Sequence, residues 1–193
     1  MINEEVFGKI YEQHIKKLKN LDTFNKKGVI CFSGIAGFGK TYIAKILEEK
    51  YKGVRISNDE IREIISGLIE EEEIDSLTYS YLRWLIQNYK FRNNLIILDS
   101  GIDRRYKERF SLFKEKGYQI FIVRLKVSEA VYERRIIEKF GKLDDNYINR
   151  IDDWKKQYKE FGENVKSDII IENEKDNELN LELLYSKLDT LIK

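Results

Sequence analysis

The sequence predicts an α/β protein with a central parallel sheet of five strands. Two observations lead to this class: short β-rich apolar runs recur between longer segments of helical periodicity, and most of those runs are apolar without clean alternation. Continuous apolar runs are typical of strands buried on both faces, and the intervening helices supply the cover that a parallel sheet requires. The expected strands are residues 29–33, 54–57, 95–99, 119–125 and 168–171.

Amphipathic segments fill the intervals between these strands. Over residues 2–21, apolar side chains such as Val6 and Ile10 fall near helical spacing while charged residues take the other positions, which predicts a helix packed on the domain. Further helices are expected near residues 40–50, 76–89 and 179–192. The chain has no proline and shows no internal repeat, so we interpret all 193 residues as one domain.

The composition excludes several classes of protein. With 42% hydrophobic residues the chain can bury a core, which excludes intrinsic disorder despite 36% charged residues. A net charge of +1 gives no bulk positive field, so we expect no stable nucleic-acid complex, and any anion must be held by a local site. A lone His14 and a lone Cys31 cannot assemble a zinc site or a Cys/His nucleophile pair.

Two further features predict the compartment. A single cysteine cannot form an internal disulfide, and residues 1–20 are charged throughout instead of containing an apolar signal core. No apolar run approaches the ~20 residues that a membrane-spanning helix needs. We therefore expect a cytoplasmic protein without a membrane partner.

Residues 34–41, GIAGFGKT, fit the spacing G-x-x-x-x-G-K-[ST], directly after an apolar strand and at the start of a helix. Backbone N–H groups can wrap a phosphate chain only where side chains do not obstruct the approach, which accounts for Gly34, Gly37 and Gly39. Lys40 is placed to reach the β- and γ-phosphates, and the Thr41 hydroxyl to ligate Mg²⁺ in the first helical turn. A chance match is the alternative, and the strand before and helix after argue against it.

This motif predicts a site for a nucleoside triphosphate, and we expect ATP with Mg²⁺. It does not by itself specify a reaction. The candidate nucleotide-binding residues are Gly34, Ala36, Gly37, Phe38, Gly39, Lys40, Thr41 and Tyr42.

A second polar cluster, SNDEIR at residues 57–62, lies at the end of the second strand and the start of the next helix. In a doubly wound sheet the carboxyl ends of the strands line the ligand crevice, so Asp59 and Arg62 should face the phosphate loop. Their spacing of three puts both side chains on one helix face. Asp59 could then accept a proton from an attacking hydroxyl while Arg62 holds an anionic group of the acceptor. Alternatively, Asp59 is a helix N-cap and Arg62 a surface residue.

From residue 28 to residue 171 the chain resembles P-loop kinases with an AAA-type domain: polynucleotide 5′-hydroxyl kinases, gluconate-type kinases, zeta-toxin-like kinases and chloramphenicol phosphotransferase. The resemblance rests on the phosphate loop, on D-x-x-R at residues 59–62, and on LDSG at 98–101, RR at 104–105 and ERR at 133–135. It implies a P-loop NTPase fold with strand order 2-3-1-4-5. Of these groups, the polynucleotide kinases match best at D-x-x-R.

The resemblance also implies roles for individual residues. Asp59 would be the general base and Arg62 would grip the acceptor. Arg134 or Arg135, on a helix after the fourth strand, would contact the transferring phosphate as part of a lid; the alternative is that both are solvated. A second lid arginine is replaced here by Glu138 or Lys139, depending on the alignment.

Two more candidate site residues lie at or just after the end of a predicted strand. Asp99 ends an apolar strand, where P-loop proteins commonly place an acid that orders a magnesium-bound water or a neighbouring arginine, although it could instead cap a turn. We therefore count Asp99 among the metal and substrate residues. Arg104 completes the expected substrate-binding set.

Together these features predict an ATP-dependent kinase with a hydroxyl acceptor, either a nucleic-acid 5′ end or a small molecule. Lys40, Asp59, Arg134 and Arg135 are the candidate catalytic residues. The alternative from another class is a nucleotide-binding switch or interaction protein, whose segments order around the γ-phosphate. Such a protein would not need the pair Asp59 and Arg62 at an acceptor position.

Overall fold

In the computed structural model, residues 4–15, 27–68, 73–88, 95–141, 145–175, 179 and 181–192 are described. The strands of this part of the chain are β1 (Gly28–Ser33), β2 (Val54–Ser57), β3 (Ile96–Gly101), β4 (Gln119–Lys126) and β5 (Ile169–Glu172). Its helices are α1 (Glu4–Ile15), α2 (Lys40–Tyr51), α3 (Asn58–Ser66), α4 (Ile74–Asn88), α5 (Tyr106–Glu115), α6 (Glu129–Phe140), α7 (Asp145–Asn164) and α8 (Glu182–Ile192).

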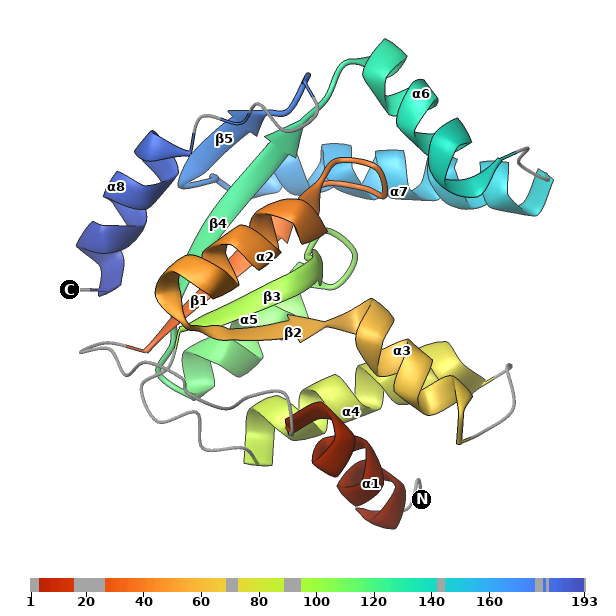
Figure 1. The fold of residues 1–193 in the computed structure, drawn as a ribbon. Helices are drawn as coiled ribbons and strands as arrows, with labels where there is room; N and C mark the ends of the chain where they lie inside the picture. The colour runs from red at the N-terminus through yellow and green to blue at the C-terminus, as the bar shows by residue number, and fades with distance from the viewer. Residues whose placement is uncertain are drawn as a thin grey trace.

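The five strands form one parallel sheet in the order β2-β3-β1-β4-β5, which confirms the predicted fold class (Figure 1). The pairing of β1 with β3 is regular up to Cys31 opposite Leu98, but Phe32 then pairs with Gly101. Two residues of β3, Asp99 and Ser100, are therefore extra at this point. Such a bulge redirects side chains at a strand end, and here it lies at the carboxyl edge of the sheet.

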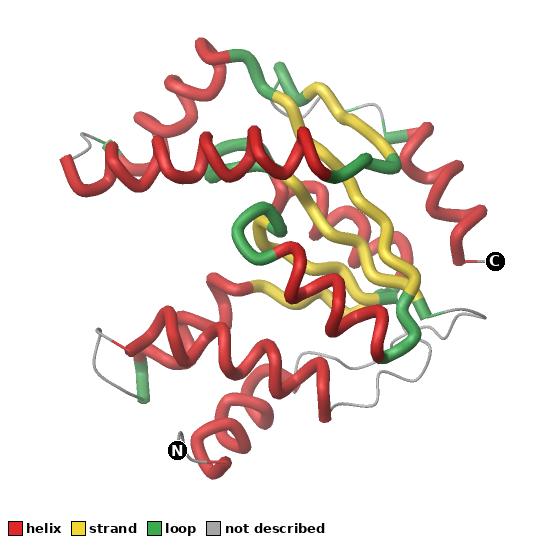
Figure 2. The backbone as a smooth tube through the Cα atoms, turned by 180° about the vertical axis from the view of Figure 1, so that it is seen from behind, coloured by secondary structure: helices red, strands yellow, loops and turns green. Residues whose placement is uncertain are grey.

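Both faces of the sheet are covered by helices, as the continuous apolar runs predict. Along β1, Val29 and Cys31 belong to the core on the side of α4 and α5, whereas Ile30 and Phe32 belong to the core beneath α2 and α8. This alternation is the two-residue period of a strand. Figure 1 shows α2 in front of the sheet, and Figure 2, seen from behind, shows the helices that cover the other face.

Helix α1 packs on α3 and α4 at the β2 side of the sheet. The Phe7 ring lies 5.9 Å from the Tyr81 ring and 5.7 Å from the Trp84 ring, measured between centroids. His14 is buried, with its Nδ1 atom 3.2 Å from the Tyr81 hydroxyl. The helix expected over residues 2–21 is thus present over Glu4–Ile15, and residues 16–21 lie outside the described part of the chain.

The strand boundaries differ from the sequence-based expectation at two places that matter below. β3 continues past Asp99 to Gly101, because its bulged end still pairs with Phe32. β5 begins at Ile169 instead of at Asp168. Asp168 stays outside the strand because its carboxylate accepts a hydrogen bond of 2.7 Å from the Ile122 backbone N–H, and its own N–H donates to the Ile122 carbonyl.

Candidate active site

The phosphate loop connects β1 to α2 at the carboxyl edge of the sheet (Figure 1). Gly39 precedes α2 with φ of 88°, and a Cβ atom there would overlap with Asn173 Nδ2. Gly39 is therefore required by both its backbone conformation and its close neighbour. The N-cap residue of α2, Gly39, makes no side-chain capping hydrogen bond. The first N–H groups of this helix are therefore available to an anion bound by the loop.

The Lys40 side chain folds back onto this loop, and its Nζ atom donates a hydrogen bond of 2.7 Å to the Ile35 carbonyl. Burial lowers the pKa of Lys40 to about 8, against the opposing effect of the negative charges of Asp103 and Asp99. An ammonium group held in this way is poised to exchange the carbonyl for a phosphate oxygen.

Thr41 and Asp99 form the pair expected for a magnesium site. The Thr41 hydroxyl donates a hydrogen bond of 2.9 Å to Asp99 Oδ1, across the gap between the start of α2 and the end of β3. Hydroxyl and carboxylate oxygens are ligands that Mg²⁺ prefers, and this ion takes its other ligands from phosphates and water. These residues fit Mg²⁺. No cluster of three or more His, Cys, Asp and Glu side chains suited to a metal ion occurs among the described residues.

Arg55, on β2, was not predicted as a site residue, yet it fixes Asp99. Its Nη1 atom donates to Asp99 Oδ2 at 2.8 Å and its Nε atom to Glu48 at 2.7 Å, and its Nη2 atom donates to Glu60. Burial works against the charged form, but the hydrogen bonds to Glu60 and Glu48 outweigh it and raise the pKa of Arg55. Arg55 thereby connects the pair of Thr41 and Asp99 to α2 and to α3.

Asp103, also missed by sequence reasoning, holds the first turn of the phosphate loop. Its buried carboxylate accepts hydrogen bonds from the Ser33 hydroxyl at 2.6 Å and from the Gly34 N–H at 2.9 Å. Burial raises the pKa of Asp103 in spite of these hydrogen bonds and of the Lys40 charge. An acid four residues beyond a strand-end acid has no motif of its own, so no signal in the sequence marks this role.

Asp59 lies in the first turn of α3, and the structure rejects the alternative that it caps this helix. The N-cap is Ser57, whose hydroxyl accepts a hydrogen bond of 3.4 Å from the Glu60 N–H. The Asp59 side chain is largely exposed and accepts a hydrogen bond of 2.8 Å from Arg62 Nη1. Its negative charge acts on Lys40, where it raises the pKa. The S-x-x-E pattern at residues 57–60 was the sequence signal for the true cap.

Helix α6 lies against the phosphate loop. Arg135 donates hydrogen bonds of 3.4 Å to the Gly37 carbonyl and to Asn173 Oδ1, and Asn173 Nδ2 in turn donates to the Phe38 carbonyl at 3.0 Å. The positive charge of Lys139, one turn further along α6, acts on Lys40. Arg134 is exposed on the same helix. The structure thus brings Arg135 into contact with the loop and Lys139 within electrostatic range of Lys40.

The remaining predicted residues occupy different surroundings. The Phe38 ring is buried against the rings of Tyr132 and Tyr158, with centroids 5.8 and 5.4 Å away, so only its backbone faces the phosphate side. Ala36 is partly exposed in the loop, and Tyr42 is exposed on α2. Arg104 lies in the turn after β3, where burial lowers the pKa of its guanidinium and the negative charge of Asp75 opposes this shift.

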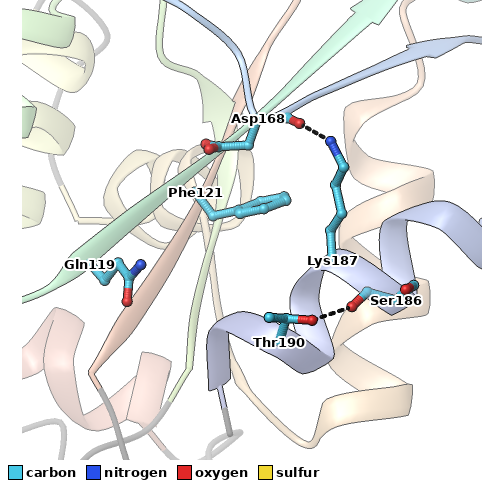
Figure 3. Close-up of a pocket in the computed structure, with 6 residues that line it drawn as sticks. All are labelled: Gln119, Phe121, Asp168, Ser186, Lys187 and Thr190. Atoms are coloured by element: carbon cyan, nitrogen blue, oxygen red, sulfur yellow. Dashed lines mark hydrogen bonds between the residues drawn. The ribbon is translucent and has the colours of Figure 1, made fainter.

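A depression of about 360 Å³ lies elsewhere, between β4, β5 and α8 (Figure 3). Gln119 opens β4 and Asp168 precedes β5, so the depression lies at the amino ends of these strands, opposite the phosphate loop. The Lys187 ammonium already donates to the Asp168 carbonyl there.

Among the described helices, none is long and apolar enough to cross a membrane.

Comparisons with known proteins agree with this geometry. The sequence model of the AAA domain family matches residues 29–161, which include every site residue discussed above except Asn173. No curated protein matches the chain. A solved chain from the PezAT chromosomal toxin–antitoxin system of Streptococcus pneumoniae has a TM-score of 0.66 at 16% identity, over 93% of this chain and 81% of that chain.

Two solved kinases share the fold as well. Shikimate kinase from Aquifex aeolicus has a TM-score of 0.54 at 20% identity, over 84% of this chain and 98% of the kinase. The APS kinase CysC from Mycobacterium tuberculosis has a TM-score of 0.53 at 14% identity, over 86% of this chain and 97% of the kinase. The family match covers more than half of the 193 residues, and the sheet order and phosphate loop agree with it: the chain belongs to the AAA domain family and has a P-loop kinase-like fold.

Proposed function

We propose that this protein is a nucleotide-dependent kinase that transfers the γ-phosphate of ATP to a hydroxyl group of a small molecule. One observation carries the proposal: Asp59 lies in the first turn of α3 with an exposed carboxylate, and its negative charge raises the pKa of the Lys40 ammonium group. A cation suited to phosphates and a proton acceptor thus lie within electrostatic range of each other, as phosphoryl transfer to a hydroxyl needs.

Each residue of the site has its own role in the proposed reaction. The N–H groups of the phosphate loop and the Lys40 ammonium bind the β- and γ-phosphates. Thr41 and Asp99 would hold Mg²⁺, which would neutralise phosphate charge. The acceptor oxygen forms a bond to the γ-phosphorus as the bond from that phosphorus to the bridging oxygen of ADP breaks. Asp59 takes the hydroxyl proton, and ADP and the phosphorylated acceptor leave.

The lid residues act on the transferring group. Arg135 donates a hydrogen bond to the phosphate loop, and the positive charge of Lys139 acts on Lys40. We therefore assign to these two residues the stabilisation of negative charge that a lid arginine provides in related kinases. Arg134 is exposed on the neighbouring face, and a role for it requires movement of α6 toward the crevice.

Two observations favour a small-molecule acceptor over a nucleic-acid 5′ end. Shikimate kinase and APS kinase, which share this fold, are named for small acceptors. The net charge of +1 provides no field to attract a polynucleotide. A short 5′ end could still be gripped by a few arginines, so both kinds of acceptor enter the test.

The experiment is a transfer screen with γ-labelled ATP and Mg²⁺ against pooled hydroxyl compounds and 5′-hydroxyl oligonucleotides. Label should appear in a small-molecule pool, and Lys40→Ala should abolish it. Transfer only to oligonucleotides would overturn the acceptor assignment. Slow ATP hydrolysis without transfer to any pool, unaffected by Asp59→Asn, would favour a nucleotide-binding switch over a kinase.

A further inference from the structure

Arg109, in the first turn of α5, is buried behind the sheet, on the face opposite α2 (Figure 1). Its Nη1 atom donates a hydrogen bond of 3.0 Å to the Ser100 hydroxyl and another of 3.2 Å to the Gly101 carbonyl. Both acceptors are uncharged, and Arg109 forms no ion pair with any residue that the structure describes. This buried charge is therefore bound to the end of β3.

The cost of burying Arg109 argues against a role in packing alone. Burial lowers the pKa of Arg109, which means that the interior disfavours its charged form. An arginine nevertheless stays protonated, so the folded protein bears this cost. An apolar side chain of similar volume would fill the same space without it, and such replacements of buried charges are often neutral or stabilising. The arginine is thus better explained by what its hydrogen bonds hold.

These hydrogen bonds hold β3 at the point where it separates from β1. The bulge leaves Asp99 and Ser100 without a partner on β1, as unpaired residues of a bulge are. Arg109 donates to the second of these two residues and to Gly101, which follows them. On the β1 side of the bulge, its guanidinium therefore replaces the strand pairing that is lost.

The bulge carries Asp99, the candidate Mg²⁺ ligand. The Asp99 carboxylate accepts hydrogen bonds from the Thr41 hydroxyl and from Arg55, and its backbone continues directly into Ser100. A shift of Ser100 would therefore move Asp99 relative to Thr41. Groups that orient metal ligands without touching the metal typically change metal affinity by about 10–100-fold when they are removed.

The phosphate loop, in contrast, is held without Arg109. Beyond the bulge, the Ile102 N–H donates a hydrogen bond of 2.9 Å to the Phe32 carbonyl. Asp103 then accepts its hydrogen bond of 2.9 Å from the Gly34 N–H at the start of the loop. These contacts join the chain after the bulge directly to β1 and to the loop. Loss of Arg109 should therefore displace the Mg²⁺ ligand and leave the loop in place.

We propose that Arg109 is a positioning residue for Mg²⁺: from behind the sheet it holds the β3 bulge, and so keeps Asp99 at the distance from Thr41 that the ion requires. This inference rests on the proposed function, because the ion accompanies the nucleotide. It adds a residue outside the candidate site that sets how strongly nucleotide binding depends on Mg²⁺.

The test compares nucleotide binding with and without the ion. The affinity for a non-hydrolysable ATP analogue is measured by calorimetry, in Mg²⁺ and in EDTA, for wild type and for Arg109→Met, whose side chain fills space but donates no hydrogen bond. In EDTA the two proteins should bind the analogue equally, since the phosphate loop is intact. In Mg²⁺ the variant should bind it about tenfold more weakly than wild type.

Two further variants separate positioning from a general loss of stability. Ser100→Ala removes only the hydroxyl that accepts from Arg109, so it should also weaken binding in Mg²⁺ but not in EDTA. The double variant Arg109→Met/Ser100→Ala should be no worse than Arg109→Met, because the two residues act through one contact. Lys114→Met, at an exposed position of α5, is the control and should bind like wild type in both conditions. If Arg109→Met does not fold, Ser100→Ala carries the test.

Two results would overturn the inference: equal affinities of wild type and Arg109→Met in Mg²⁺, or a loss of the same size in Mg²⁺ and in EDTA. The second result would make Arg109 a residue that supports the whole fold. Failure of the proposed function has a different signature. Absence of transfer to any acceptor leaves these binding measurements unaffected, whereas a wild-type protein that binds no analogue in either condition would overturn the nucleotide site and this inference with it.

Discussion

The proposed nucleotide half and the proposed acceptor half of the candidate site are built in different ways. On the nucleotide side, charged groups are buried and interlocked: the side chain of Asp99 is 2% exposed and that of Arg55 is 9% exposed. On the acceptor side the charges stand in solvent, with the Asp59 side chain 76% exposed and that of Asp75 61% exposed. Charged residues thus form a buried, hydrogen-bonded network in one half and an exposed surface in the other.

This difference predicts different consequences of mutation. Breaking a buried ion pair leaves a charge in a medium of low polarity and costs several kcal/mol, whereas an exposed pair contributes about 0–1 kcal/mol. Changes in the acceptor half should therefore alter turnover and leave stability intact. Changes to the buried network of charges should alter both turnover and stability.

The largest effect is expected from Asp59→Asn. Loss of the proton acceptor should lower kcat by ~10²–10⁴-fold, while the melting temperature stays unchanged because the side chain is exposed and Ser57 provides the cap. Glu63→Gln, at an exposed position of the same helix, is the control and should have wild-type kcat. Near-normal turnover in Asp59→Asn would remove this residue from the mechanism, and a large loss of melting temperature would make it structural.

Lys40→Ala should reduce transfer by at least ~10²-fold, since one preorganised charge near the phosphates is lost. The fold should persist, because Lys40 makes a hydrogen bond to the loop but belongs to neither core cluster. Circular dichroism and kcat measurements on Lys40→Ala and on Lys45→Ala, an exposed position of the same helix, would check this. Full activity in Lys40→Ala would contradict the assignment of the phosphate loop.

Arg55→Met directly tests the buried network of charges around Asp99. It leaves Asp99 without its cation, so we expect a loss of about 3 kcal/mol in the free energy of unfolding and a higher Mg²⁺ concentration for half-maximal activity. Urea denaturation and a Mg²⁺ titration measure the two effects. Arg83→Met, which breaks an exposed ion pair, should cost less than about 1 kcal/mol. Equal losses in the two variants would remove the contrast between the halves.

The smallest effect concerns pH. With a pKa of about 8, Lys40 is cationic below pH 8 and becomes neutral above it, so nucleotide affinity should be constant below pH 8 and fall as the pH rises. Between pH 7.5 and 9 we expect a loss of about tenfold, since each pH unit beyond the pKa removes a factor of ten of the charged form. Calorimetric titration should show a flat profile for Lys40→Arg, because arginine stays protonated; an equal decline would exclude Lys40 as the cause.

The sequence was sufficient to predict those features of the structure that depend on residues close together in the chain. Residues 34–41 have the phosphate-loop geometry because glycine tolerates positive φ and because the helix start presents its N–H groups, and both properties are local. The apolar runs located the five strands to within two residues, since burial on both faces demands continuous hydrophobicity. The family resemblance then supplied the strand order.

The capping of α3 was within reach of the sequence but was assigned to Asp59 as one alternative. Ser57 and Glu60 stand at capping-box spacing, and a serine at the end of a strand is as good an N-cap as an aspartate. The structure decided between them because the strand ends at Ser57, which places Asp59 inside the first turn.

Only the tertiary structure decided how the charged residues are shared between the two halves. Arg55 meets Asp99 from 44 positions away, Asp103 meets Gly34 from 69 away, and Asn173 meets Phe38 from 135 away. The hydrogen bond from Arg62 to Asp75 likewise joins α3 to α4. Such contacts follow from the β3 bulge and from parallel strands that bring their carboxyl ends to one edge. Local sequence patterns carry no information on which distant partner arrives there, because side-chain pairing across the sheet is set by packing, and packing exists only once the chain has folded.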